Sequence, residues 1–163
     1  MAIKMKYLLF PLFTLIGACQ QKEHCCTNID IGVDIFLKNK AGQNLFLPAT
    51  PNAIDPNAIR LIYLVGGQEE SFYAGHLDCP TNVCFVADMG MEHVVIFPND
   101  IENEPYPETF IKWTDADMDT MRCHFIRKNQ GSFLVCDSVW FNETLMFPDS
   151  ALSEFGRAFN VFK

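Results

Sequence analysis

The chain has 163 residues and a mass of 18.5 kDa, which suits one domain and little more. Hydrophobic residues make up 49% and charged residues 20%, a composition that excludes a disordered or fibrous protein. Twelve basic and 20 acidic residues give a net charge of −8, which argues against a nucleic-acid-binding protein, because phosphates require a basic face. Seven cysteines are unusual for a protein of the reducing cytosol.

The first 18 residues have the three parts of an export signal. Lys4 and Lys6 form a basic start, and residues 7–16 form an apolar stretch that contains one proline. This stretch is about half as long as the ~20 residues that a membrane-spanning helix needs. The small residues Gly17 and Ala18 follow, so we predict a secretory signal peptide over residues 1–18.

The end of this signal resembles the lipobox of bacterial lipoproteins, with the sequence Ile-Gly-Ala-Cys at residues 16–19. The resemblance implies a diacylglyceryl group on the Cys19 thiol, cleavage before Cys19, and further acylation with a palmitate-like chain. Ile16 departs mildly from the commoner leucine. Because each buried methylene contributes ~0.8 kcal/mol, two or three acyl chains would hold the protein at a membrane. The alternative is an ordinary secreted protein whose first cysteine happens to lie at the cleavage site.

The expected anchor is the lipid and not the protein surface. Removal of residues 1–18 deletes two lysines and no acid, which leaves a charge of −10 over 145 residues. Anionic headgroups would repel so acidic a chain. Residues 19–28 are interpreted as a tether, of which residues 20–24 resemble the sorting signal of lipoproteins on the outer face of the Bacteroidota outer membrane. A plain polar spacer is the other interpretation of these residues. We therefore expect a lipid-anchored protein of the bacterial cell envelope, at the outer membrane.

Period-two alternation of apolar residues dominates the rest of the chain and favours β-strands. Two loops rich in proline and asparagine, over residues 48–58 and 98–107, and a short helical turn over 150–156 interrupt the alternation. The pattern predicts one domain over residues 29–163, an all-β antiparallel β-sandwich of eight or nine short strands, immunoglobulin-like or transthyretin-like. Aromatic residues, including Trp113 and Trp140, are expected mostly in its core. The segments expected as strands are 29–36, 59–65, 83–86, 93–97, 109–113, 121–128, 132–142, 143–147 and 157–162, and residues 70–74 could be the hairpin partner of 59–65.

Several segments resemble small lipoproteins of Bacteroidota. The resemblance lies in residues 25–32, 38–45 and 48–52, and again in residues 111–117 and 139–142. These proteins have no assigned activity. The resemblance implies a lipoprotein with a β-sandwich and no particular chemistry.

Six cysteines remain after lipidation of Cys19, and an even number in an exported chain suggests disulfides. Cys79 and Cys84 flank a turn and could close a small ring. The adjacent pair Cys25 and Cys26 allows no assignment. The six candidates are Cys25, Cys26, Cys79, Cys84, Cys123 and Cys136.

The geometry of one hairpin suggests a particular bond. If residues 129–130 form a two-residue turn, Cys123 lies opposite Cys136 at a non-hydrogen-bonded position, within reach of a disulfide. Such a bond would stabilise the fold by roughly 3 kcal/mol. A three-residue turn with a bulge at Gly131 would place Asp137 opposite Cys123 instead, and reduced core thiols are the alternative.

No metal site, catalytic residue or cofactor is predicted. The run His24-Cys25-Cys26 lacks the second pair of ligands that zinc requires. Asp115, Asp117 and Asp119 could share one face of a strand and hold calcium, but the glycine and distal glutamate of a calcium loop are missing. A solvated edge or turn is the simpler interpretation. His93 and His124 are expected at the sheet surface, and no nucleophile elbow, zinc-protease motif or phosphate loop occurs.

The function expected from these observations is a non-catalytic binding or assembly module at a membrane, with a protein or glycan partner. The two proline-rich loops are where a sandwich usually carries recognition. The alternatives are an envelope enzyme with a site of dispersed residues, and a structural or adhesive subunit that assembles through an exposed strand edge.

Overall fold

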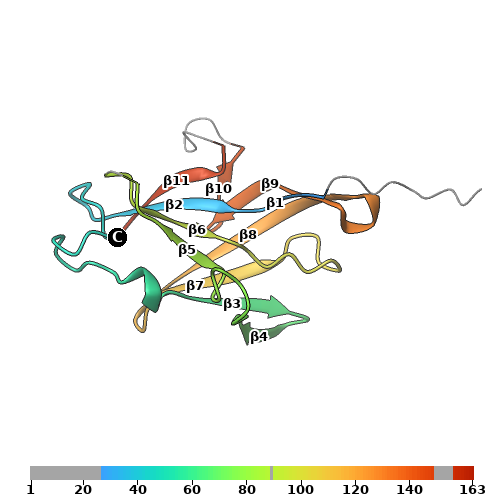
Figure 1. The fold of residues 1–163 in the computed structure, drawn as a ribbon, viewed down its shortest axis with the longest axis horizontal. Helices are drawn as coiled ribbons and strands as arrows, with labels where there is room; N and C mark the ends of the chain where they lie inside the picture. Colours follow the sequence, from blue (N-terminus) through green and yellow to red (C-terminus); the bar gives the residue numbers. More distant parts are fainter. Residues whose placement is uncertain (1–26, 89, 149–155) are drawn as a thin grey trace, which may run out of the picture.

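The computed structural model describes residues 27–88, 90–148 and 156–163. The predicted signal peptide, Cys19, Cys25, Cys26 and most of the expected turn at 150–156 lie outside these residues. Two β-sheets pack together (Figure 1), so the prediction of an all-β sandwich is confirmed. The helical content of the described residues is two short 3-10 turns, η1 (Pro56–Ala58) and η2 (Asn129–Gly131).

In the part of the chain that the structure describes, the larger sheet contains seven strands and the smaller sheet four. The long strands β8 and β9 run diagonally across the molecule (Figure 1). The large sheet has the order β1 (Asn28–Asp30), β9 (Phe133–Phe141), β8 (Asp117–Lys128), β7 (Glu108–Thr114), β3 (Arg60–Val65) and β4 (Gln68–Ser71), with β10 (Thr144–Phe147) also on β9. The small sheet has the order β11 (Ala158–Phe162), β2 (Val33–Lys38), β6 (His93–Ile96) and β5 (Val83–Val86).

The expected antiparallel arrangement needs a correction at two strand pairs. β1 runs parallel to β9, and β11 runs parallel to β2, whereas every other pair in the described residues is antiparallel. A parallel pair needs a long connection, and most of the chain separates the two members of each of these pairs. Alternation in the sequence reports which face a residue occupies and carries no information about strand direction.

The strand predicted over residues 29–36 is two strands in different sheets. The chain leaves β1 in the large sheet at Asp30 and enters β2 in the small sheet at Val33. A Cβ atom at Gly32 would lie 3.0 Å from Cγ1 of Val95, so a glycine allows the close approach at this crossing. The sequence predicts a single strand here because the alternation of apolar residues continues through the crossing.

The core lies between the two sheets. In β2, Val33, Ile35 and Leu37 are fully buried, and in β7 the same holds for Ile111 and Trp113. The residues between them face outward and are more polar or partly exposed, which is the pattern of a sandwich with two solvated faces. Trp113 therefore lies in the core, as expected.

Two cations at the ends of β11 join the small sheet to the large one. Arg157, just before β11, donates from Nε to the carbonyl of Gly32 (2.9 Å) and from Nη1 to the carbonyl of Cys136 in β9 (3.1 Å), and pairs with Asp30. Lys163, just after β11, places its ammonium 2.8 Å from Asp117 Oδ1 and 2.5 Å from Asp119 Oδ2 in β8.

Asp119 is the buried member of this second contact, with 8% of its surface exposed. Besides Lys163, it accepts hydrogen bonds from Nε1 of Trp113 (2.6 Å) and from Nδ2 of Asn142 (2.8 Å). The carboxylate is thus fully partnered, and its contacts join β7, β8, the β9–β10 turn and the end of β11. The expectation of a solvated acidic edge was wrong for this residue.

Loss of this carboxylate should destabilise the fold strongly. We predict that Asp119→Ala lowers the free energy of unfolding by about 3 kcal/mol, because it leaves the Trp113 indole N–H without its acceptor and removes the buried one of the two carboxylates that pair with Lys163. Asp115→Ala is the matched control, since Asp115 lies in the neighbouring turn and is fully exposed. Urea denaturation curves measure both, and equal midpoints for the two variants would contradict the prediction.

Candidate functional site

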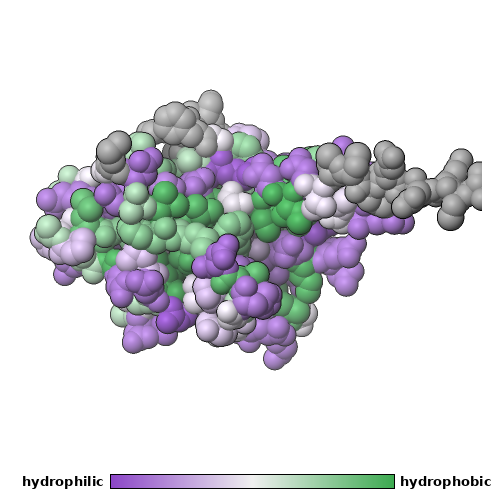
Figure 2. Space-filling model, viewed as in Figure 1, coloured by the Kyte–Doolittle hydropathy of each residue, from purple (hydrophilic) through white to green (hydrophobic). Residues whose placement is uncertain are grey.

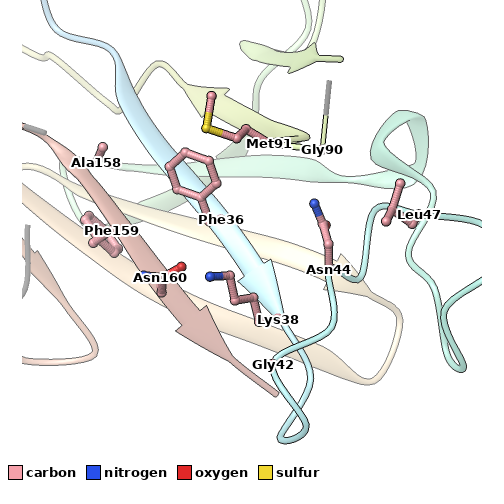
Figure 3. A pocket seen from close by; sticks show the side chains of 10 residues that line it. All are labelled: Phe36, Lys38, Gly42, Asn44, Leu47, Gly90, Met91, Ala158, Phe159 and Asn160. Atoms are coloured by element: carbon pink, nitrogen blue, oxygen red, sulfur yellow. The ribbon is translucent and has the colours of Figure 1, made fainter. Parts of the chain in front are cut away.

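A cavity with a volume of about 420 Å³ lies on the outer face of the small sheet. Alternation in β2 sends Phe36 and Lys38 to this face, and alternation in β11 sends Asn160 to it. The turns after β2 and before β6 supply Leu47 and Met91 as walls. Figure 3 shows Phe36 and Lys38 on the same side of β2, with Asn160 of β11 beside Lys38.

Hydrogen bonds and ring contacts hold the walls of this cavity in place. Nδ2 of Asn44 donates to the carbonyl of Glu92 (2.8 Å), which fixes the turn after β2 against the start of β6. The rings of Phe36 and His93 lie 4.8 Å apart between centroids. His93 in turn contacts the carbonyl of Met91 (2.8 Å) and Oδ1 of Asp34 (3.2 Å).

Lys38 gives the cavity its charge. The Lys38 ammonium forms no ion pair with any acid of the described residues. Among the described residues that line the cavity, Lys38 is the one with an ionisable side chain. The surrounding face is apolar: Figure 2 shows a band of hydrophobic residues where β2 and β6 lie in Figure 1, with hydrophilic residues on either side. Phe36 and Val95 are partly exposed outward residues of these two strands. The site can therefore hold a ligand that has an apolar body and an anionic group.

A second surface lies on the outer face of the large sheet. Tyr106, half exposed in the 98–107 loop, packs against the rings of His124 (5.4 Å between centroids) and Trp140 (5.5 Å). The guanidinium of Arg122 lies 5.6 Å from the centre of the Trp140 ring, and His124 binds Asp137 at 2.6 Å. Trp140 thus faces outward and does not belong to the core cluster. Tyrosine, tryptophan and arginine are the residues that most often carry binding energy at interfaces.

The histidines expected at the sheet surface are there. His93 lies on the outer face of the small sheet and His124 on the outer face of the large sheet, and both are partly exposed. Each is paired with an aspartate of its own sheet, Asp34 and Asp137 respectively.

The three aspartates do not form a common site. Asp117 and Asp119 share the ammonium of Lys163, whereas Asp115 lies in the turn and pairs with Lys112 at 2.8 Å. The hydrogen bond from Lys112 lowers the pKa of Asp115. Across the described part of the chain, no three histidine, cysteine, aspartate or glutamate side chains are grouped in a way that could hold a metal ion.

Cys79 and Cys84 form a disulfide, with their Cα atoms 5.4 Å apart. The bond closes the turn that leads into β5, and the amide of Asn82 donates to the carbonyl of Cys79 inside it (2.9 Å). This is the small ring that the sequence allowed.

The expected register of the β8–β9 hairpin was wrong, and Cys123 and Cys136 are free, buried thiols. Residues 129–131 all have positive φ, so the connection is longer than a two-residue turn, and Lys128 pairs with Phe133. A bulge at Asp137 then shifts the register again. Cys123 lies opposite Val139, and Cys136 lies opposite Phe125.

Both thiols still point into the core, one from β8 and the other from the neighbouring strand β9. A hydrogen bond with Cys136, together with burial, raises the pKa of Cys123 well above its ordinary value. The length of the connection and the bulge were the missing information: the longer connection alone places Cys136 opposite Phe125, and nothing in the sequence around Asp137 distinguishes a bulged position from a paired one.

No protein-family model, curated protein or solved structure matches the chain. Within the described ranges, no helix is long and apolar enough to cross a membrane.

Alkylation should distinguish the two kinds of cysteine. We predict that iodoacetamide leaves Cys123 and Cys136 unmodified in the native protein, because both are fully buried, and modifies them in urea without any reductant. Cys79 and Cys84 should react only after reduction. Peptide mass spectrometry measures all four, and modification of Cys123 that required a reductant would contradict the free-thiol assignment.

Proposed function

We propose that this protein is a lipid-anchored lipoprotein of the bacterial cell envelope, located at the outer membrane, and that its sandwich is a non-catalytic binding module. The cavity between β2, β11 and the 90–91 turn is the observation that carries the binding part of the proposal. Its volume of about 420 Å³ lies within the range of small-molecule sites, and its lining combines apolar walls with a few polar groups.

The chemistry of the lining favours an amphipathic anion. Phe36, Leu47 and Met91 offer apolar and aromatic contact, and Met91 and Leu47 lie partly in solvent until a ligand covers them. Lys38 and Asn160 stand side by side at one end, where an ammonium and an amide can bind a carboxylate, sulfate or sulfonate. Because the whole chain is acidic, a simple anion would be repelled, so the apolar body must supply much of the affinity.

A fluorescent probe of this chemistry tests the site. The dye anilinonaphthalene sulfonate has an aromatic body and one sulfonate, and we predict that the folded protein binds it and increases its fluorescence. Lys38→Gln should weaken binding about three-fold or more, because it removes the partner of the sulfonate.

Lys40→Gln is the matched control for this experiment, because Lys40 is exposed in the turn that follows β2, two residues after Lys38, and does not line the cavity. It should leave the affinity unchanged. Equal weakening in both variants would indicate a general charge effect and would contradict a site at Lys38. A thermal denaturation curve for each variant shows whether it is folded under the conditions in which dye binding is measured.

The anchor rests on residues 1–19 and has its own test. Radiolabelled palmitate should enter the wild-type protein and the control Cys25→Ala, but not Cys19→Ala, because only Cys19 follows the Ile-Gly-Ala tripeptide of the lipobox-like segment. Cells that express each variant, followed by gel fluorography, give the result. Label in Cys19→Ala would contradict the proposal, whatever the outcome of the dye experiment.

A further inference from the structure

The side chains of Lys163 and Asp119 meet at the end of β11 in a place that water hardly reaches. The ammonium nitrogen Nζ of Lys163 lies 2.5 Å from Oδ2 of Asp119, and only one bond joins that oxygen to the carboxyl carbon, Cγ. The exposed fraction of the side chain is 20% for Lys163 and 9% for Asp119. A nitrogen and a carboxyl carbon held this close, with little water around them, have the geometry from which an amide bond can form.

The backbone holds both residues in position. The amide of Lys163 donates to the carbonyl of Lys38 in β2 (2.9 Å), which fixes the residue that follows β11. Asp119 lies opposite Ile111 of β7, in a strand that has neighbours on both sides. Because both backbones are fixed by their sheets, the two side chains are brought together by folding itself, and the reaction between them is intramolecular.

Asp117 supplies the base that such a reaction needs. A lysine attacks a carboxyl group only as the neutral amine, so Nζ of Lys163 must first give up a proton. Oδ1 of Asp117 lies 2.8 Å from Nζ, within reach to accept this proton. A cavity of about 290 Å³ lies beside Asp117 and Lys163 and offers a released water molecule a way out.

Two hydrogen-bond donors activate the carboxyl group of Asp119. Nδ2 of Asn142 donates to Oδ1 (2.8 Å), and Nε1 of Trp113 donates to Oδ2 (2.6 Å). Each donor draws electron density from its oxygen and makes Cγ a better target for the nitrogen. The donors also stabilise the negative charge that develops on the oxygens when the nitrogen adds. Trp113 is completely buried, so water does not compete for its N–H.

The charges of this cluster favour loss of the ion pair. Burial of ions costs free energy, and the ammonium of Lys163 and the carboxylate of Asp119 are both largely buried. An amide replaces these two charges by one neutral group. The charge that remains is that of Asp117, whose side chain is the most exposed of the three at 36%.

We propose that Lys163 and Asp119 become joined by an intramolecular amide bond, which forms without an enzyme once the chain has folded. Asp117 takes one proton from the ammonium, Nζ adds to Cγ of Asp119, and the bond between Cγ and Oδ2 breaks. A second proton from the nitrogen and the proton held by Asp117 pass to Oδ2, which leaves as water. An ammonium and a carboxylate thus give an amide and one water molecule, so the reaction needs no oxidant or other reactant.

The bond ties the end of β11 to β8 and so links the small sheet covalently to the large one. It closes a loop over residues 119–163, and a cross-link of this kind restricts the unfolded chain. The inference goes beyond the proposed binding function, because no residue of this cluster lines the cavity near Lys38. Dye binding at that cavity and the cross-link can therefore fail separately.

Peptide mass spectrometry of the full chain tests the bond. Trypsin cleaves after Lys112, Arg122 and Arg157, which places Asp119 in the peptide 113–122 and Lys163 in the peptide 158–163. After complete denaturation and digestion, the wild-type protein should give one branched peptide, with the summed mass of the two peptides less one water molecule. Fragmentation of the branched peptide should place the link between Asp119 and Lys163.

Three variants separate a covalent bond from an ion pair. Lys163→Arg keeps a cation beside the two aspartates, but a guanidinium stays protonated and does not attack, so the two peptides should appear separately. Asp117→Asn removes the base and should lower the linked fraction at least about ten-fold. Asp115→Asn changes an exposed carboxylate of the neighbouring turn and should leave the linked fraction as in the wild type.

Two results on the wild-type chain would overturn the proposal, whether or not each variant folds. If residues 113–122 and 158–163 appear only as separate peptides of full mass, the contact is an ion pair and nothing more. If the link joins Lys163 to Asp117, the roles of the two carboxyl groups are wrongly assigned. An undiminished linked fraction in Asp117→Asn would likewise contradict the role of Asp117 as the base.

Discussion

Two cations at the ends of one short strand fix the two sheets of this molecule against each other. β11 contributes only five residues, yet Arg157 precedes it and Lys163 follows it, and each reaches a polar group of the large sheet. The contact at Lys163 is the stronger constraint, because Asp119 is almost completely buried and is bound by three donors from different parts of the chain. A buried carboxylate needs all of these partners, so it fixes the relative position of β7, β8, the β9–β10 turn and β11.

The position of the cavity follows from this arrangement. With β11 fixed beside β2, Asn160 and Lys38 come together on the outer face of the small sheet and complete the cavity with Phe36. Among the described residues, the small sheet ends at β5 after four strands, opposite a large sheet of seven. One layer is shorter than the other, and its last strand leaves Phe85 exposed to solvent.

The sequence predicted what local patterns encode and missed what depends on partners distant in the chain. Alternation located the strands of residues 59–65, 83–86 and 109–113 within a few residues, and glycines 66 and 67 marked the β3–β4 turn. It could not reveal that Gly32 marks a crossing between sheets, since the alternation runs through it. Nor could it show the long connection over residues 129–132, which places Cys136 opposite Phe125, or the bulge at Asp137, which shifts Cys123 one residue further to Val139. The cavity unites residues separated by more than 100 positions, so it leaves no motif in the sequence.

Hydrogen exchange in a variant that lacks both cations tests the central role of β11 most directly. Phe159 and Val161 lie on the side of β11 that bonds to β2, between Arg157 and Lys163. In the double variant Arg157→Met, Lys163→Met, their amides should lose most of their protection, while those of Ile111 and Met121 in the middle of the large sheet remain protected. Unchanged protection of Phe159 and Val161 in that variant would contradict the account, because the strand would then be held without its two cations.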